Sequence, residues 1–117
     1  MYIIGSNAIK HWYPDFKREP KDIDYLVNDK SMWKNIPGKE EYHENEVLWN
    51  YIKGNSKYLE PNLLLTLKMS HLFWDLNWEK HMFDVQFLLG KGCVLNKELF
   101  HKLYNFWSAY HGKNTRS

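Results

Sequence analysis

A chain of 117 residues with a formal net charge of +2 is long enough for one folded domain, and too nearly neutral to bind nucleic acid through its overall charge. Six Trp, eight Tyr and six Phe supply much of the expected core. The single Cys93 excludes an internal disulfide and is compatible with a reducing compartment. No stretch approaches the ~18 apolar residues of a membrane span, and no signal peptide precedes the first apolar stretch. A cytoplasmic protein without membrane contact is expected.

The first half of the chain predicts a small mixed sheet, because short apolar runs alternate with turn-forming and polar segments. The expected elements are a strand over residues 2–4, a helix over 7–12 capped by Ser6, a basic loop over 14–21, a strand over 23–27, a short helical stretch over 28–33, an edge-like strand over 39–43 and a helix over 46–52.

The second half predicts three helices with apolar faces. Pro61 suits the first turn of one helix, Asn77 caps the next, and Asn96 caps the last, which Gly112 ends. The fold class is therefore α/β (α+β), with a mixed sheet of three or four strands backed by a helical C-terminal half. One domain is expected over residues 1–112, with residues 113–117 as a flexible tail.

The most informative stretch joins Gly5-Ser6, at the end of the first strand, to Asp22 and Asp24 on the second. A Gly-Ser turn at a helix start offers backbone N–H groups and a hydroxyl to a phosphate. Two carboxylates two residues apart on a strand point to the same face. The pattern indicates a site for a nucleoside triphosphate and its metal ions. The alternative is that both carboxylates are ordinary solvent-facing residues and that Gly5 only makes a turn.

This order of strand, Gly-Ser, helix, loop and Asp-x-Asp strand resembles the polymerase-beta-like nucleotidyltransferase superfamily, and the chain also looks like uncharacterised phage-encoded members. The resemblance implies that Asp22 and Asp24 bind two Mg²⁺ ions and that Gly5 and Ser6 hold the outer phosphates of the NTP. It also implies a third carboxylate on a neighbouring strand. Glu40, Glu41 and Glu44 are the candidates.

Strand alternation selects Glu41 among these candidates. Tyr42 is the residue of its strand most expected to face the core, which turns Glu41 to the opposite side. In the strand over residues 23–27 the apolar residues Ile23, Tyr25 and Val27 likewise oppose Asp24, so matching the apolar faces puts Glu41 beside Asp24.

The helical half contributes further candidates. The resemblance implies that Lys68 and Lys80 contact phosphate. His71, His81 and Asp84 have a spacing compatible with zinc, although hydrogen-bonded packing of these side chains is the preferred interpretation.

The function expected from the resemblance is Mg²⁺-dependent transfer of a nucleoside monophosphate from an NTP to a hydroxyl of a protein, an RNA or a small molecule. The alternative is a catalytically inactive nucleotidyltransferase fold that binds a nucleotide or a protein partner through an aromatic surface, in phage–host conflict. A weaker third possibility is an RNA-binding module that uses Lys17, Arg18 and Lys21.

Overall fold

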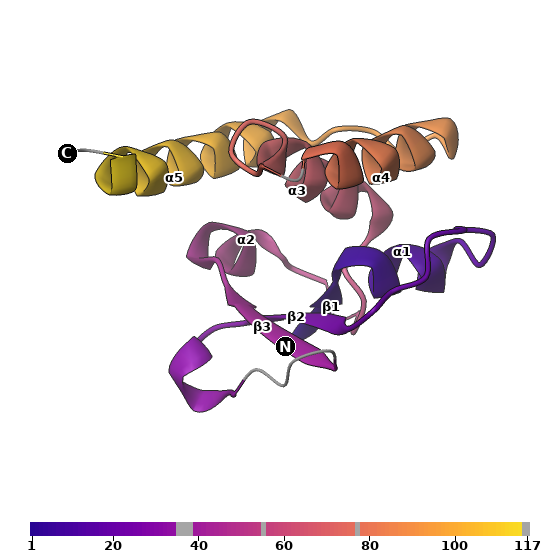
Figure 1. Cartoon of the computed structure of the whole chain (residues 1–117), viewed down its shortest axis with the longest axis horizontal. Coiled ribbons are helices and arrows are strands. Elements are labelled where there is room, and N and C mark those ends of the chain that lie inside the picture. The colour runs from indigo at the N-terminus through magenta and orange to yellow at the C-terminus, as the bar shows by residue number, and fades with distance from the viewer. Residues whose placement is uncertain (35–38, 55, 77, 116–117) are drawn as a thin grey trace. The chain divides into compact units, whose positions relative to one another are not determined.

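The computed structural model describes residues 1–34, 39–54, 56–76 and 78–115, with side chains described as far as Tyr110. The chain divides into two compact units, Met1–Leu64 and Leu65–Ser117. The first unit holds all strands of the described residues, and helices make up the second (Figure 1). No helix within the described ranges is long and apolar enough to cross a bilayer.

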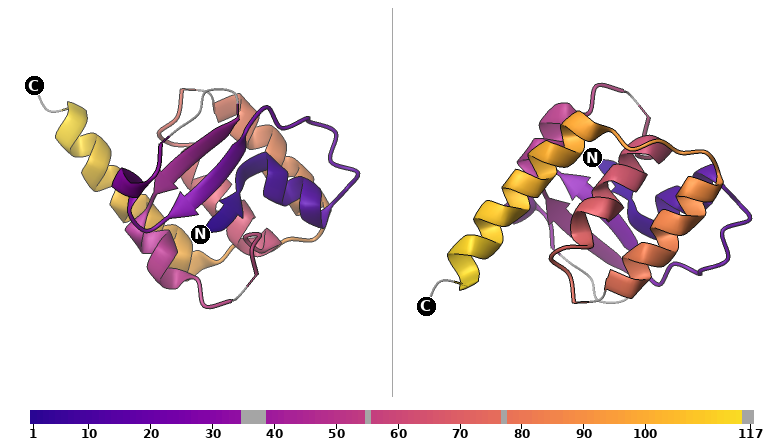
Figure 2. Two further views of the ribbon diagram at one scale, coloured as in Figure 1. Left: turned by 90° about the horizontal axis from the view of Figure 1, so that it is seen from below. Right: turned by 90° about the horizontal axis from the view of Figure 1, so that it is seen from above.

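The first unit is built on a three-stranded mixed sheet in the order β1-β2-β3. β1 (Tyr2–Ile4) pairs antiparallel with the central strand β2 (Ile23–Val27), and β3 (Glu40–Glu44) pairs parallel with β2. The three strands are seen side by side in Figure 2. The predicted pairing of the first two strands and the mixed α/β fold class are confirmed.

Aromatic stacking determines which side chains of β3 lie on each face of the sheet. Tyr42 is paired in register with Tyr25, and their rings stack with centroids 5.3 Å apart. Trp33 also stacks on Tyr42, with the two ring centroids 5.1 Å apart. Because side chains alternate along a strand, this stack turns Glu41 and His43 to the opposite face of the sheet.

Helix α1 (Gly5–Trp12) follows β1 without a loop, which corrects one expectation. Ile4 is the N-cap residue and no side chain caps the helix, so the prediction that Ser6 caps a helix over residues 7–12 is wrong. The reason is the conformation of Gly5, whose φ of +72° turns the chain directly from strand into helix. Glycine adopts this conformation without the steric penalty that a Cβ would bring.

Two further elements and the connection that follows them belong to the first unit. The 3₁₀ turn η1 (Lys30–Met32) begins at Asp29, whose carboxylate accepts from the Ser31 amide. Helix α2 (Glu46–Tyr51) is capped by Asn45, whose Oδ1 accepts from the Leu48 amide at 3.0 Å. The connection after α2 returns to the sheet, where the Ile3 amide donates to the Lys57 carbonyl and the Leu59 amide donates to the Ile3 carbonyl.

The helical half contains α3 (Pro61–His71), α4 (Trp78–Gly90) and α5 (Lys97–Thr115). Residues 65–71 of α3 lie between α4 and α5 (Figure 2). Asn96 caps α5 as expected, because its Oδ1 accepts from the Leu99 amide at 3.0 Å. The predicted helix end at Gly112 is wrong, since α5 continues through Thr115. The predicted Asn77 cap and residues 116–117 of the predicted tail lie outside the described residues.

A buried ion pair links α3 to α4. Lys68 Nζ lies 2.9 Å from Asp84 Oδ2, and the exposed side-chain fractions are 7% and 0%. Removing two charges from water costs several kcal/mol per ion, and the mutual attraction offsets this only while both partners are present. The two helices therefore depend on the pair remaining intact.

Replacing Lys68 with Met should destabilise the chain by about 3–5 kcal/mol, because Asp84 is left as a buried charge without its cation. The double variant Lys68→Met/Asp84→Leu should recover most of this loss. Urea unfolding followed by far-UV circular dichroism measures both. The control is Lys102→Met, which removes an exposed pair with Glu98 and should change stability by less than about 0.5 kcal/mol. A Lys68→Met variant as stable as this control would contradict the role of the pair.

Candidate metal centre

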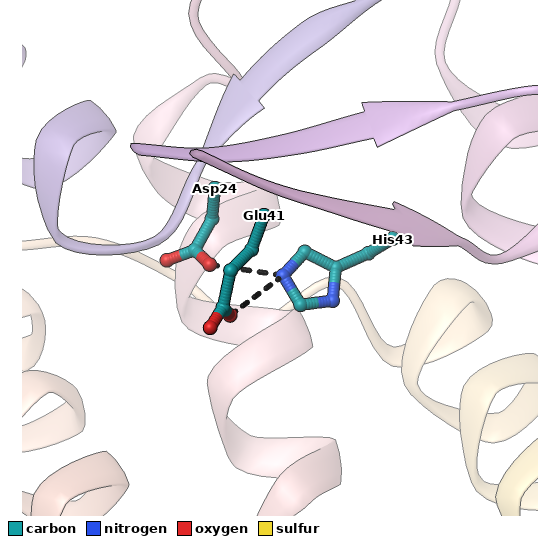
Figure 3. Close-up of side chains that lie close together, drawn as sticks. All are labelled: Asp24, Glu41 and His43. Atoms are coloured by element: carbon teal, nitrogen blue, oxygen red, sulfur yellow. Dashed lines mark hydrogen bonds and ion pairs between the residues drawn. The ribbon is translucent and has the colours of Figure 1, made fainter. Parts of the chain in front are cut away.

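The candidate centre lies where β2 and β3 run side by side. Their parallel register places Asp24 opposite Glu41. Asp24, Glu41 and His43 point toward one another from these two strands (Figure 3). Each offers one ligand atom, and these three atoms all lie within 4.8 Å of one another. His43 Nε2 is 2.9 Å from Asp24 Oδ1 and 3.7 Å from Glu41 Oε2.

Asp22 joins this group through Glu41. Burial raises the pKa of Glu41, and a side-chain hydrogen bond with Asp22 and the negative charges of Asp22 and Asp24 raise it further, whereas His43 acts in the opposite direction. Two carboxyl groups share a hydrogen bond only when one of them holds a proton. The Asn7 side-chain amide donates to the Asp22 carbonyl at 2.7 Å, which ties the start of β2 to helix α1. Asp22, Asp24 and Glu41 therefore lie together, but the predicted placement of Asp22 on the second strand is wrong, since β2 begins at Ile23.

The start of α1 lies against the same carboxylates. A Cβ built on Gly5 would stand 2.6 Å from Asp24 Oδ2, a distance that real Cβ atoms essentially never show. Register explains the proximity, because Ile4, immediately before Gly5, is the partner of Asp24 on β2. Ser6 is buried in the first turn of α1. The end of the helix that attracts anions is therefore next to the centre.

The donor set fits a divalent cation. Three carboxylates crowd together and repel one another unless a proton or a cation compensates their charge. Carboxylate oxygens suit Mg²⁺, Ca²⁺ and Mn²⁺, and the imidazole nitrogen adds a donor that transition metals accept. The side chains of Asp24, Glu41 and His43 are partly exposed, which leaves room for a ligand from solvent.

The other predicted residues are not part of this group of three ligand atoms. Glu40 accepts a hydrogen bond from the Tyr42 hydroxyl at 2.7 Å, and Glu44 accepts from the Lys30 amide at 3.3 Å, so neither competes with Glu41 for the centre. Lys68 and Lys80 belong to the second unit, where Lys68 is committed to Asp84 and Lys80 is exposed. Their contact with phosphate stays a prediction.

His43 is the residue that sequence reasoning missed. Its position two residues after Glu41 places it on the same strand face, and this alternation was the available signal. The histidines weighed as metal ligands, His71 and His81, lie in the helical unit, where His81 Nε2 bonds Asp75 Oδ2 at 2.7 Å. Within the described residues they do not join a group of three ligands.

Comparison with known proteins places the chain in a family without defining its chemistry. The family model described as "Domain of unknown function (DUF7277)" matches residues 1–102. The chain therefore belongs to this family, and the match includes every residue of the candidate centre. No curated protein and no solved structure matches the chain. The resemblance to nucleotidyltransferases stays a prediction.

The Gly5 contact predicts an unusually costly alanine substitution. Gly5→Ala combines a positive φ, worth about 1–2 kcal/mol, with the collision against Asp24. Gly92 is the matched control, because its φ is +88° and nothing lies within 4 Å of the position that a Cβ would take there. Urea unfolding should show that Gly5→Ala costs more than Gly92→Ala. In an Asp24→Ala background the excess should shrink. Equal costs for the two glycines would contradict the close approach.

The crowded carboxylates predict a pH-dependent penalty at Glu41. Its folded-state pKa is raised above 4.5, so ionisation of Glu41 favours the unfolded chain as the pH rises from 4.5 through the folded-state pKa. In EDTA, Glu41→Gln should therefore raise the melting temperature at neutral pH, with a gain that disappears in acid. Carbon-detected NMR titration of the Glu41 carboxyl should give a pKa above 4.5 that falls in Asp22→Asn. A value at or below 4.5 in the wild type would refute this account.

Proposed function

We propose that this chain is a metal-dependent nucleotidyltransferase, which moves a nucleoside monophosphate from an NTP to a hydroxyl of a protein, an RNA or a small molecule. The observation that carries the proposal is that Asp24 on β2, Glu41 on β3 and Asp22, just before β2, converge beside the start of α1. Transfer of this kind depends on positioning and charge neutralisation more than on covalent chemistry by the protein.

In this proposal Asp22, Asp24 and Glu41 hold two Mg²⁺ ions. When bound, Mg²⁺ would neutralise the triphosphate and stabilise the attacking and leaving oxygens. The raised pKa of Glu41 is consistent with this assignment, because burial and the neighbouring acids Asp22 and Asp24 disfavour its negative charge, and a cation would relieve that effect.

The chain's own groups would perform the remaining steps. Backbone N–H groups of Gly5 and Ser6, at the uncapped end of α1, would bind the outer phosphates. Glu41 would accept the proton of the acceptor hydroxyl, since it would lie beside the metal ions within hydrogen-bond reach of that hydroxyl. The hydroxyl oxygen then bonds to the α-phosphorus, the bond from that phosphorus to the bridging oxygen breaks, and pyrophosphate leaves.

Location and acceptor are part of the proposal. The one cysteine is a buried thiol with no second cysteine in the chain to form a disulfide, which is compatible with the reducing, NTP-rich cytoplasm. Exposed aromatic side chains at Phe73, Trp78 and Phe83 would offer contact to a protein partner or acceptor.

The test is label transfer from α-³²P-labelled NTPs, each with Mg²⁺, to the chain itself, to total RNA and to lysate protein. Wild type should transfer label, and Glu41→Gln should reduce the rate by at least about 10²-fold, because it removes both a ligand and the general base. The matched control is Glu44→Gln, whose carboxylate lies on the same strand but bonds Lys30, and it should retain activity.

Calorimetry separates transfer from binding. Mg²⁺ and a non-hydrolysable ATP analogue should bind the wild type but not Asp22→Asn/Asp24→Asn. If the wild type binds nucleotide, the double variant does not, and the wild type transfers label to no acceptor, the chain is better described as an inactive nucleotide-binding module. If the double variant binds nucleotide as well as the wild type does, Asp22 and Asp24 are not the nucleotide site of an enzyme or of a binding module.

A further inference from the structure

The imidazole of His43 distinguishes this centre from one made only of carboxylates. Its Nε2 is directed at both neighbouring acids, at 2.9 Å from Asp24 Oδ1 and 3.7 Å from Glu41 Oε2 (Figure 3). The three ligand atoms lie within 4.8 Å of one another, so one ion at their centre would meet two oxygens and one nitrogen.

The position of His43 follows from the sheet and not from a chance rotamer. Parallel pairing sets His43 opposite Leu26, two residues beyond the Asp24–Glu41 pair. Alternation then places His43 and Glu41 on one face of β3, while the Tyr42 stack holds the opposite face. The nitrogen donor is consequently supplied by the same strand register that brings the carboxylates together.

We infer that Asp24, Glu41 and His43 form a mixed oxygen and nitrogen site that selects Mn²⁺ over Mg²⁺. Mg²⁺ is a hard ion that prefers carboxylate and water oxygens. First-row transition ions accept an imidazole ligand more readily than Mg²⁺ does, and Mn²⁺ also binds carboxylates, so it is the transition ion to compare with Mg²⁺ at this site. Asp24 and Glu41 would accept either ion, so His43 decides the preference. The inference rests on the metal centre of the proposed function but not on nucleotidyl transfer.

Electron paramagnetic resonance on the full chain tests the inference directly, with Mn²⁺ as the probe. Unbound Mn²⁺ gives a strong six-line spectrum, so titration yields the dissociation constant, and competition with Mg²⁺ yields the preference. Wild type should prefer Mn²⁺, and pulsed spectra should show coupling to a directly bound ¹⁴N. His43→Gln should lose this coupling and weaken Mn²⁺ binding at least about ten-fold, since loss of even an outer-sphere partner weakens metal binding 10–100-fold.

Two variants sharpen the test. His43→Asp replaces nitrogen by oxygen, so it should keep Mg²⁺ binding and lose the Mn²⁺ preference. The matched control is the exposed His101→Gln on α5, which should behave as wild type. Circular dichroism confirms that each variant is folded.

The outcomes separate this inference from the proposed function. If Glu41→Gln abolishes metal binding while His43→Gln leaves it unchanged, and no ¹⁴N coupling is seen, His43 has no role as a ligand. The carboxylate centre of the proposed function would then still stand. A Mn²⁺ preference that depends on His43 in a chain without transfer activity would support the inference and count against the enzyme. Absence of Mn²⁺ and Mg²⁺ binding in the wild type would overturn both.

Discussion

The parallel pairing of β2 and β3 is the constraint on which the candidate centre depends. One register step either way would replace the Asp24–Glu41 pair and turn Glu41 to the other face of the sheet. The stacked Tyr25 and Tyr42 rings oppose such a slip, because it would separate them. β1 adds a second constraint, since its pairing brings Gly5 against Asp24. Aromatic packing on one face of the sheet therefore fixes the position of the acidic centre on the opposite face.

Strand pattern made the sheet and most of the centre predictable. Tyr42 is the one large apolar side chain of its strand, so placing it in the core was enough to choose Glu41 over Glu40 and Glu44. His43 escaped notice because a histidine on a polar strand face is usually solvated, and its proximity to Asp24 requires the register as well as the alternation. The start of α1 was misplaced because a positive φ at Gly5 leaves no mark on the sequence beyond the glycine itself.

The helical half shows why a charged residue is hard to interpret from sequence. Lys68 and Asp84 lie sixteen positions apart on different helices, and only packing brings them to 2.9 Å. Seen alone, Lys68 on a helix looks available for phosphate, whereas the structure commits it to a buried carboxylate. His81 is also a buried polar residue of this half: burial lowers its pKa, and the hydrogen bond to Asp75 opposes that change. Buried polar groups of this kind fix which helix faces meet.

The two halves therefore use carboxylates in opposite ways. Asp84 is buried beside the ammonium group of Lys68, so its charge is compensated within the fold. Burial raises the pKa of Glu41, and its two acidic neighbours Asp22 and Asp24 raise it further, whereas His43 acts in the opposite direction. Folding that brings like charges together is unfavourable, so this arrangement lowers stability where a substitution such as Gln would not. A bound cation would remove this repulsion among the carboxylates. It would also bind more strongly to carboxylates that the fold already holds together than to separated ones, so the same arrangement that lowers stability favours cation binding.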